Sequence, residues 1–428
     1  MIKYHPKKYV YIKNFIYGGF FMNEISTKGK LILGLQHVLA MFGATVLVPF
    51  LTGLNPSIAL LTAGVGTLIF HFCTKRIVPV FLGSSFAFIG AIALVLKEEG
   101  LASVKGGVIA AGLVYVFMSF LVRIYGIEKI KSFFPPIVVG PIIVVIGLRL
   151  SPTAITMAGY SNGSFDLKSL LVSGTVVICM ILISSFGKSF FKLIPILISV
   201  TVGYILASFM GMVDFTPIKE ASWIGFSPEA IHSLTTIPKI SLTGILAIAP
   251  IAFVVFIEHI GDITTNGAVV GKDFFKNPGI SRTLLGDGLA TISAGFLGGP
   301  ANTTYGENTG VLAVTKVYDP SILRIAACYA IVLSFIGKFG VILQTIPVPV
   351  MGGISVILFG MIASVGMRTL IESQLDFSLS RNLIIASLIL VFGIGIDNVI
   401  IWKTVSLSGL AIAAFVGIAL NKIFPEND

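Results

Sequence analysis

The chain is dominated by apolar runs of about 20 residues separated by short polar links. A run of this length can cross the hydrocarbon core of a bilayer as a helix, in which every backbone polar group is paired internally. The pattern therefore predicts an all-α polytopic membrane protein with fourteen transmembrane segments. These segments cover residues 31–51, 56–74, 78–97, 104–124, 133–157, 168–187, 191–213, 241–265, 281–298, 301–317, 321–345, 350–366, 380–399 and 405–424.

Two of the fourteen segments, the third and the tenth, are poor helices. Residues 79–90 read PVFLGSSFAFIG and residues 299–310 read GPANTTYGENTG. Their proline, glycine and small polar residues should interrupt the helix before Phe86 and before Glu307, leaving a short extended stretch followed by a half-helix. Extended backbone at membrane depth is tolerated only inside protein or beside a water-filled cavity. A pair of such segments, one in each half of the chain, is typical of the binding site of a transporter.

An internal repeat relates the two halves. The stretches FPPIVVGPIIVVIG and IPVPVMGGISVILFG lie about half a chain apart. Each has a proline followed by two glycines at spacings of four and seven residues: Pro136, Gly140 and Gly147 in one, and Pro349, Gly353 and Gly360 in the other. Because each half contains seven predicted spans, the two copies must cross the membrane in opposite directions. The sequence therefore predicts two inverted seven-span repeats, with chance spacing in a glycine-rich chain as the alternative.

Composition and charge agree with a membrane protein. The chain is 55% hydrophobic and 11% charged, whereas soluble domains are about 25% charged. The net charge of +10 is spread over the ends of apolar runs on one side, so we expect both termini in the cytoplasm, lipid as a partner and no nucleic acid. Residues 1–30 form a predicted cytoplasmic N-terminal segment, in which Met22 is an alternative start. The three cysteines show no metal-binding or redox spacing.

Acidic residues within the apolar runs are the candidate chemistry. In FVVFIEHIGDITTNG, Glu258 and Asp262 are four residues apart and share one helix face. If both carboxylates were ionised in a low dielectric they would repel each other, so we expect at least one of them to hold a proton. If the span ends early, Asp262 is instead an ordinary solvated charge. Glu307 follows the second interruption, where it either caps the half-helix or binds a ligand.

The two predicted half-helix N-termini define what the ligand should look like. Backbone N–H groups at Phe86 and beside Glu307 can donate to carbonyl oxygens, and carboxylates can accept from ligand N–H groups. The Phe86 ring can stack on a flat ligand. An anion fits poorly beside Glu258 and Glu307, whereas a nucleobase fits well.

Four motifs resemble a known family. GLQHVLAMFGATVLVPF, FLGSSFAFIGAI, IEHIGD and NTTYGENTGVLAVTKVY resemble the nucleobase–cation symporters of the nucleobase/ascorbate transporter group, in particular its bacterial uracil-transporting members, from about Leu33 to Phe424. The resemblance implies a core domain of residues 31–125 and 241–345 that moves as an elevator. It also implies a gate domain of residues 126–240 and 346–428 that forms a homodimer.

The resemblance also implies roles for single residues. Glu258 matches the main carboxylate that binds the base, and Glu307 matches the second one. Gly306 and Phe86 match residues whose backbone N–H groups reach the carbonyls. The remaining matches are Tyr305, which lines the same re-entrant segment, and His37, which helps to organise the site. His259 faces elsewhere and is expected to pack or to make an interhelical hydrogen bond.

Two positions depart from the uracil-transporting pattern. Asp262 stands where such members can carry a histidine, and Asp287 is a feature of xanthine and uric-acid members. Those members usually carry a glutamine where this chain has Glu307. We therefore expect Asp262 and Asp287, with Glu258 and His37, to couple protons or to organise the site.

These features together predict a proton-coupled uracil importer of the bacterial inner membrane. The proton is the expected coupling ion, and no cofactor, metal or enzymatic activity is expected. The alternatives are a xanthine, uric acid or other purine permease of the same family and, less favoured, an anion transporter of the same architecture.

Overall fold

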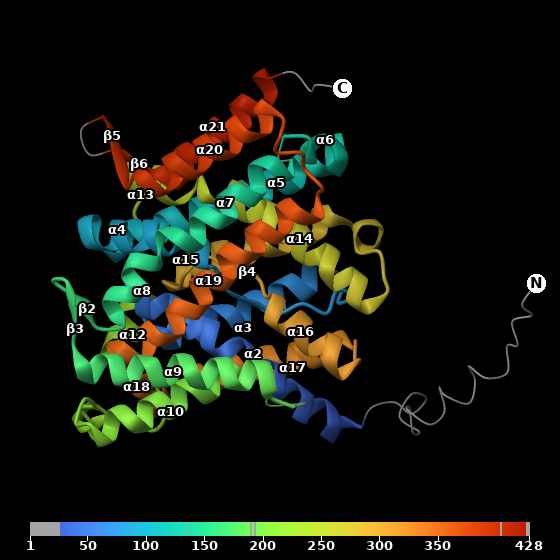
Figure 1. Cartoon of the computed structure of the whole chain (residues 1–428). Helices are drawn as coiled ribbons and strands as arrows, with labels where there is room; N and C mark the ends of the chain where they lie inside the picture. Colours follow the sequence, from blue (N-terminus) through green and yellow to red (C-terminus); the bar gives the residue numbers. More distant parts are fainter. Residues whose placement is uncertain (1–25, 134, 189–190, 192–193, 403–404, 425–428) are drawn as a thin grey trace, which may run out of the picture.

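The computed structural model describes residues 26–133, 135–188, 191, 194–402 and 405–424 (Figure 1). In the first half of the chain the elements are α2 (Thr27–Thr52), α3 (Pro56–Cys73), β1 (Leu82–Ser84), the 3-10 turn η1 (Phe86–Phe88), α4 (Ile89–Glu99), α5 (Leu101–Tyr125), α6 (Ile127–Lys131), α7 (Pro136–Arg149), α8 (Ser151–Met157), β2 (Tyr160–Ser161), β3 (Ser164–Phe165), α9 (Leu167–Phe186) and α10 (Pro195–Phe209).

The second half contains a similar series of long helices after two short ones. Its elements are α11 (Thr216–Glu220), α12 (Pro228–Thr235), α13 (Leu242–Ile248), α14 (Ile251–Val270), the helical turn η3 (Phe275–Gly279), α15 (Ile280–Leu297), β4 (Asn302–Thr304), α16 (Gly306–Thr315), α17 (Pro320–Ser334), α18 (Gly337–Gln344), α19 (Val348–Glu372), α20 (Ser380–Gly395), β5 (Asn398–Trp402), β6 (Val405–Ser408) and α21 (Gly409–Ile423).

The helices are long and apolar enough for a multi-pass membrane protein. Within the described ranges, seven helices could cross a membrane by length and composition, or eight if α17 and α18 count as one bent span. α10, α20 and α21 are shorter apolar helices. The count of fourteen segments would require these, α15 and the two interrupted segments as well, and it remains a prediction.

The extended stretch and helix predicted at both interruptions are present. β1 pairs antiparallel with β4, with Gly83 opposite Thr303. η1 and α4 follow β1, and α16 follows β4, so the two helical segments leave the small sheet in opposite directions. The would-be Cβ of Gly83 would lie 2.3 Å from the Tyr305 ring, so only glycine allows the strands and this ring to pack together.

The long helices pack in two groups. In the first, α5 packs on α15, α3 on both α15 and α17, and α2 on α17. In the second, α7 packs on α19 and α20, α9 on α10 and α19, and α20 on α21. Figure 1 shows α20 and α21 along one edge of the molecule and α9 and α10 along the opposite edge.

Small residues permit close contact between α7 and α19 in the second group. The would-be Cβ of Gly140 lies 3.1 Å from Gly366 O, and that of Gly147 lies 2.4 Å from Phe359 O. A side chain at either position would push the helices apart, which is why glycine is favoured where membrane helices approach closely. Gly140 and Gly147 are two of the repeated glycines in the sequence.

The predicted span 321–345 is wrong as a single helix. α17 ends at Ser334, and α18 runs at 82° to it. The break is stabilised from outside the helix: Gly225 N donates to Phe335 O at 2.9 Å, and Gly337 N donates to Trp223 O at 3.1 Å. Backbone groups that leave the helical ladder are thus paired with the preceding loop.

Three short sheets also modify the all-helical prediction. The β1–β4 pair occupies the predicted extended stretches, but the β2–β3 and β5–β6 hairpins were not predicted. Strand β5 begins at Asn398, so the predicted span 380–399 is too long at its end, and β6 occupies the start of the predicted span 405–424. β-branched and apolar residues in these strands gave the same hydropathy signal as a helix.

Candidate functional site

The first N–H groups of the two half-helices come to the same place because their strands pair. Beyond the ladder, Ser85 N donates to Ala301 O at 2.9 Å, and Tyr305 N donates to Phe81 O at 3.0 Å. Phe86 and Gly306 are the next residues in the chain, and each begins a helical segment. The first N–H groups of a helix have no partner within it, so those of Phe86 and Gly306 are available to a ligand.

Open space adjoins the start of α16. Gly306 and Glu307 are exposed, and a Cβ built on Gly306 would meet no atom within 4 Å. Gly310, one turn further along α16, is also exposed with nothing within 4 Å of its would-be Cβ. Glu307 in the first turn is well placed electrostatically, because a helix N-terminus carries partial positive charge.

Two acidic residues on α14 face this region. α14 packs against η1, β4 and α16, and Glu258 and Asp262 are half-buried on it. The Thr304 hydroxyl in β4 donates to Asp262 Oδ2 at 2.6 Å. α14 continues to Val270, two turns beyond Asp262, so this span does not end early and Asp262 is not simply a solvated surface charge.

Tyr305 joins the two interrupted segments. Its side chain is 4% exposed. The hydroxyl donates to Ser84 O at 2.9 Å and accepts from the Thr45 hydroxyl of α2 at 3.3 Å. These bonds use the hydroxyl inside the protein, so a ligand contact by Tyr305 would be made through its ring or backbone.

His37 contacts the start of α16 through the residue after Glu307. Asn308 Nδ2 donates to His37 O at 3.0 Å and lies 3.1 Å from His37 Nδ1. Rotating the amide would place its oxygen against the His37 carbonyl oxygen, so the nitrogen must face His37. Since an amide nitrogen only donates, Nδ1 accepts and the ring proton is on Nε2.

His259 and Asp287 form a fully buried pair between α14 and α15. Both side chains are 0% exposed, and His259 Nδ1 lies 2.7 Å from Asp287 Oδ2. On the other side of the ring, Nε2 lies 2.8 Å from the Thr283 hydroxyl. The interhelical hydrogen bond predicted for His259 is therefore confirmed.

The contacts of Thr283 identify the donor in its bond with His259. Thr283 donates its hydroxyl proton to Ile280 O at 2.8 Å, so it accepts from His259 Nε2. His259 directly follows Glu258 in the chain.

Several polar residues of this region were not singled out from the sequence. They are Thr45, Ser84, Asn266, Thr283, Thr304 and Asn308. Asn266, one turn beyond Asp262, donates to Pro79 O and to the Thr309 hydroxyl, both at 3.1 Å. It thereby connects α14 to both interrupted segments. Small polar residues inside apolar spans were the available signal, but their partners lie far away in the sequence.

Comparison with known proteins places the chain in a family. The sequence profile of a group described as the Permease family matches residues 28–401. The chain belongs to this family of permeases. It is accordingly a transporter and not an enzyme, and its apolar helices make it a multi-pass membrane protein.

The chain is similar over most of its length to curated bacterial permeases. It is 46% identical over 395 residues to a "Probable uracil permease" of Haemophilus influenzae, covering 92% of this chain and 94% of that one. It is 43% identical over 398 residues to the "Uracil permease" of Bacillus subtilis, covering 92% of each chain. The "Uracil permease" of Escherichia coli K12 is 43% identical over 395 residues, covering 92% of this chain and 90% of that one.

Solved structures of distant transporters share the fold. The transmembrane domain of the cyanobacterial bicarbonate transporter BicA superposes with a TM-score of 0.61 at 16% identity, covering 92% of this chain and 97% of that one. Murine Slc26a9, an anion transporter in an inward-facing state, superposes with a TM-score of 0.68 at 11% identity, covering 99% of this chain and 72% of that one. At these identities the likeness concerns the fold alone.

Proposed function

We propose that the chain imports uracil together with a proton across the bacterial inner membrane. The observation that carries the substrate is the 43–46% identity, over 92% of the chain, to proteins named uracil permease. The site described above supports the same choice, because it offers both donors and acceptors to an uncharged ring.

Uracil matches the polar groups of the site in number and kind. Its two N–H groups can donate to the carboxylates of Glu258 and Glu307. Its two carbonyl oxygens can accept from the backbone N–H groups of Phe86 and Gly306. The site is proposed to hold the base between α14 and the two half-helices, with the Phe86 ring against its face.

Equivalent contacts in the two halves support two inverted seven-span repeats. The Thr67 hydroxyl accepts from Leu82 N at 2.9 Å and donates to Leu82 O at 3.4 Å. The Thr291 hydroxyl accepts from Asn302 N at 3.3 Å and donates to Asn302 O at 3.2 Å. Leu82 and Asn302 each begin one of the paired strands. The helices show the same correspondence. α5 packs on α15 in the way that its proposed equivalent α17 packs on α3, the proposed equivalent of α15.

The two packing groups support an elevator. The first contains the helices of residues 31–125 and 241–345, which we propose as the moving core. The second contains those of residues 126–240 and 346–428, which we propose as the gate and as the surface of a homodimer. In Figure 1, α2 begins and α21 ends on the same side, in keeping with two cytoplasmic termini.

Proton coupling is proposed to use the acidic residues on α14 and the groups around them. Glu258 is the main candidate, because it directly precedes His259, which pairs with Asp287, on the helix that packs against both interrupted segments. Asp262 and His37 are proposed to organise the site through Thr304 and Asn308. No metal is invoked.

A xanthine or uric acid permease is the second candidate. Asp287 favours it, because it is a feature of xanthine and uric-acid members, and Asp262 departs from the uracil-transporting pattern. Asp287 is fully buried against His259, so we propose that it would act on a purine only indirectly.

Uptake into proteoliposomes separates the two substrates. Purified protein with an inward proton gradient should accumulate labelled uracil, and a 100-fold excess of unlabelled xanthine should leave that uptake nearly unchanged. Collapse of the gradient with a protonophore should abolish accumulation. Strong inhibition by xanthine would favour the purine permease, and accumulation without a gradient would contradict proton coupling.

A further inference from the structure

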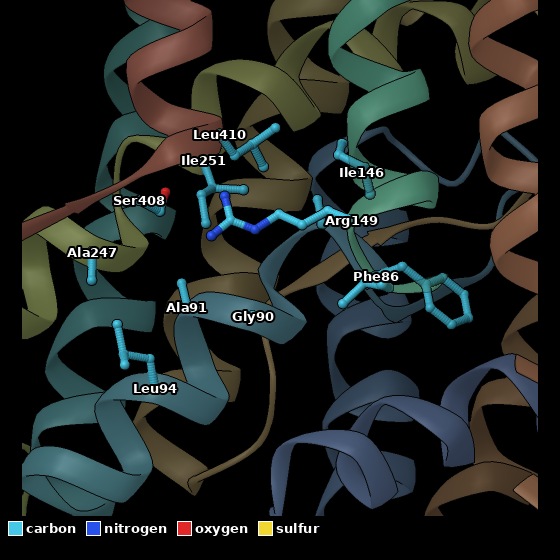
Figure 2. Close-up of a pocket in the computed structure, with 12 residues that line it drawn as sticks. Phe86, Gly90, Ala91, Leu94, Ile146, Arg149, Ala247, Ile251, Ser408 and Leu410 are labelled. Atoms are coloured by element: carbon cyan, nitrogen blue, oxygen red, sulfur yellow. The ribbon is translucent and has the colours of Figure 1, made fainter. Parts of the chain in front are cut away.

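A pocket lies where the two packing groups meet, next to the candidate site. Figure 2 shows the side chains that line it, which come from η1, α4, α13 and α14 and from α7, β6 and α21. Its walls are mostly apolar, with Leu94, Ile146 and Leu410 among them. Arg149, in the last turn of α7, is the one charged residue among those that line it.

The pocket is on the same face of α14 as the acidic residues. Ile251, which lines the pocket, precedes Glu258 by seven residues, which is two turns of helix and about 10 Å along the axis. Phe86 lines the pocket as well, although its ring points away from the other labelled residues in Figure 2. A molecule in the pocket would therefore be one short step from the N–H of Phe86 and from Glu258.

Arg149 has hydrogen-bonding capacity to spare for a ligand. Nη1 donates to Gly393 O at 3.3 Å, Nη2 donates to Asp397 O, and Nη2 lies 3.6 Å from Asp397 Oδ1. These two bonds use two of five guanidinium N–H groups, and the other three have no acceptor among the described residues. In Figure 2 the guanidinium extends across the pocket towards Ile251 and Ser408.

The chemistry of the lining selects a class of ligand. Apolar walls favour a flat ring without net charge, and a guanidinium donates well to carbonyl oxygens. A base with one carbonyl oxygen on Arg149 would keep its N–H groups free for an acceptor it meets later. Resting on the proposed function, we propose that this pocket is a second subsite where an uncharged, carbonyl-bearing pyrimidine pauses before reaching Glu258, with Arg149 as its specificity-determining residue.

Filling the pocket is the first arm of the test. A Cβ built on Gly90, which lines the pocket in α4, meets no atom within 4 Å, so Gly90→Leu should fold and occupy the space. Gly174 in α9 also has nothing within 4 Å, and Gly174→Leu is the matched control. In proteoliposomes, Gly90→Leu should lower kcat/KM for uracil about 10-fold and Gly174→Leu less than about 2-fold. Equal effects would overturn the subsite.

Removing the guanidinium is the second arm. Arg149→Met should raise KM for uracil about 10-fold, and Arg149→Lys, which keeps the charge without the planar fork, should raise it less. Asp397→Asn is the control for the ion pair of Arg149, because it removes the carboxylate 3.6 Å from Nη2 and keeps both backbone acceptors of the guanidinium. If Asp397→Asn reproduces the effect of Arg149→Met, the ion pair and not a ligand explains that effect, and the proposal is wrong.

Two further readouts complete the test. Midpoints of thermal unfolding show whether Arg149→Met folds. If it does not fold, the comparison of Gly90→Leu with Gly174→Leu decides whether the subsite exists. Acetate inhibiting uracil uptake by the wild type but not by Arg149→Met would assign the pocket to an anion and overturn the proposal. Glu258→Gln in the same vesicles reports on the proposed function separately, since it should abolish uptake while leaving the pocket intact.

Discussion

The two interrupted segments, β1 with η1 and α4 and β4 with α16, have nearly the same backbone and quite different side chains. Each has a three-residue strand whose first residue is held by a threonine hydroxyl, and each strand leads into a helix. The first helical segment starts with Phe86 and has no acidic residue in its first turn, whereas the second starts with Gly306 and Glu307.

The comparison separates two requirements of the site. In the proposed site, backbone N–H groups come from both segments, so their geometry is duplicated. The side chains differ, because one segment would supply an aromatic face and the other a carboxylate. On this proposal, two similar backbones can bind an asymmetric ligand such as uracil.

The largest effect is expected at Glu258, which both segments face. Glu258→Gln should weaken uracil binding about 100-fold, since hydrogen bonds to a charged group contribute about 1.5–3 kcal/mol each and an amide cannot accept them equally well. Titration calorimetry on purified protein measures this directly. Asp397→Asn, on an exposed loop, serves as the control. Wild-type affinity in Glu258→Gln would show that this residue does not hold the base.

Glu307 distinguishes the second segment from the first. Glu307→Gln should weaken uracil binding about 10-fold, by losing one hydrogen bond to a charge, and shift preference towards purines. Competition of labelled uracil by uracil and xanthine gives both quantities. An unchanged preference would indicate that Glu307 serves only the helix N-terminus.

A matched pair tests whether backbone and side chain have the assigned roles at the two helix starts. Gly306→Ala places a methyl group in space reserved for the ligand and should weaken binding about 5-fold without loss of stability, since nothing lies within 4 Å. Phe86→Ala keeps the backbone N–H, and it should weaken uracil binding about 3-fold because the ring contact is missing. Affinities and unfolding midpoints of both proteins are the measurement. Destabilisation by Gly306→Ala would mean that this space belongs to the protein.

The smallest effect on binding is expected at the two threonines. Thr67→Val and Thr291→Val each leave buried backbone groups without their hydroxyl partner, which should cost about 1–2 kcal/mol of stability in each case. Thr→Ser at the same positions should restore most of it. Thermal unfolding compares the four proteins. If only one of the two valine substitutions lowered the stability strongly, the two strands would not be equivalent.

The interruptions were predictable from the sequence, but their pairing was not. Proline, glycine and serine before Phe86, and the polar run before Glu307, indicate local breaks because they act on their own backbone. The register that sets Gly83 opposite Thr303 depends on contacts across more than two hundred residues. Local propensity contains no information about it.

The same limit applies to the polar contacts and to the bent span. Spacing along α14 correctly put His259 on a different face from Glu258, but Asp287 as its partner required the packing of α15. The break after Ser334 has no proline to mark it, and it is stabilised by the loop around Trp223 and Gly225. Interactions of this kind are tertiary, and an apolar run looks continuous without them.

The most direct test of the central claim is a structure of the protein with uracil bound. The account predicts the base between α14 and the two half-helices, with its carbonyl oxygens at hydrogen-bonding distance from the backbone nitrogens of Phe86 and Gly306 and its N–H groups on Glu258 and Glu307. Uracil bound elsewhere, or held without either helix start, would contradict it.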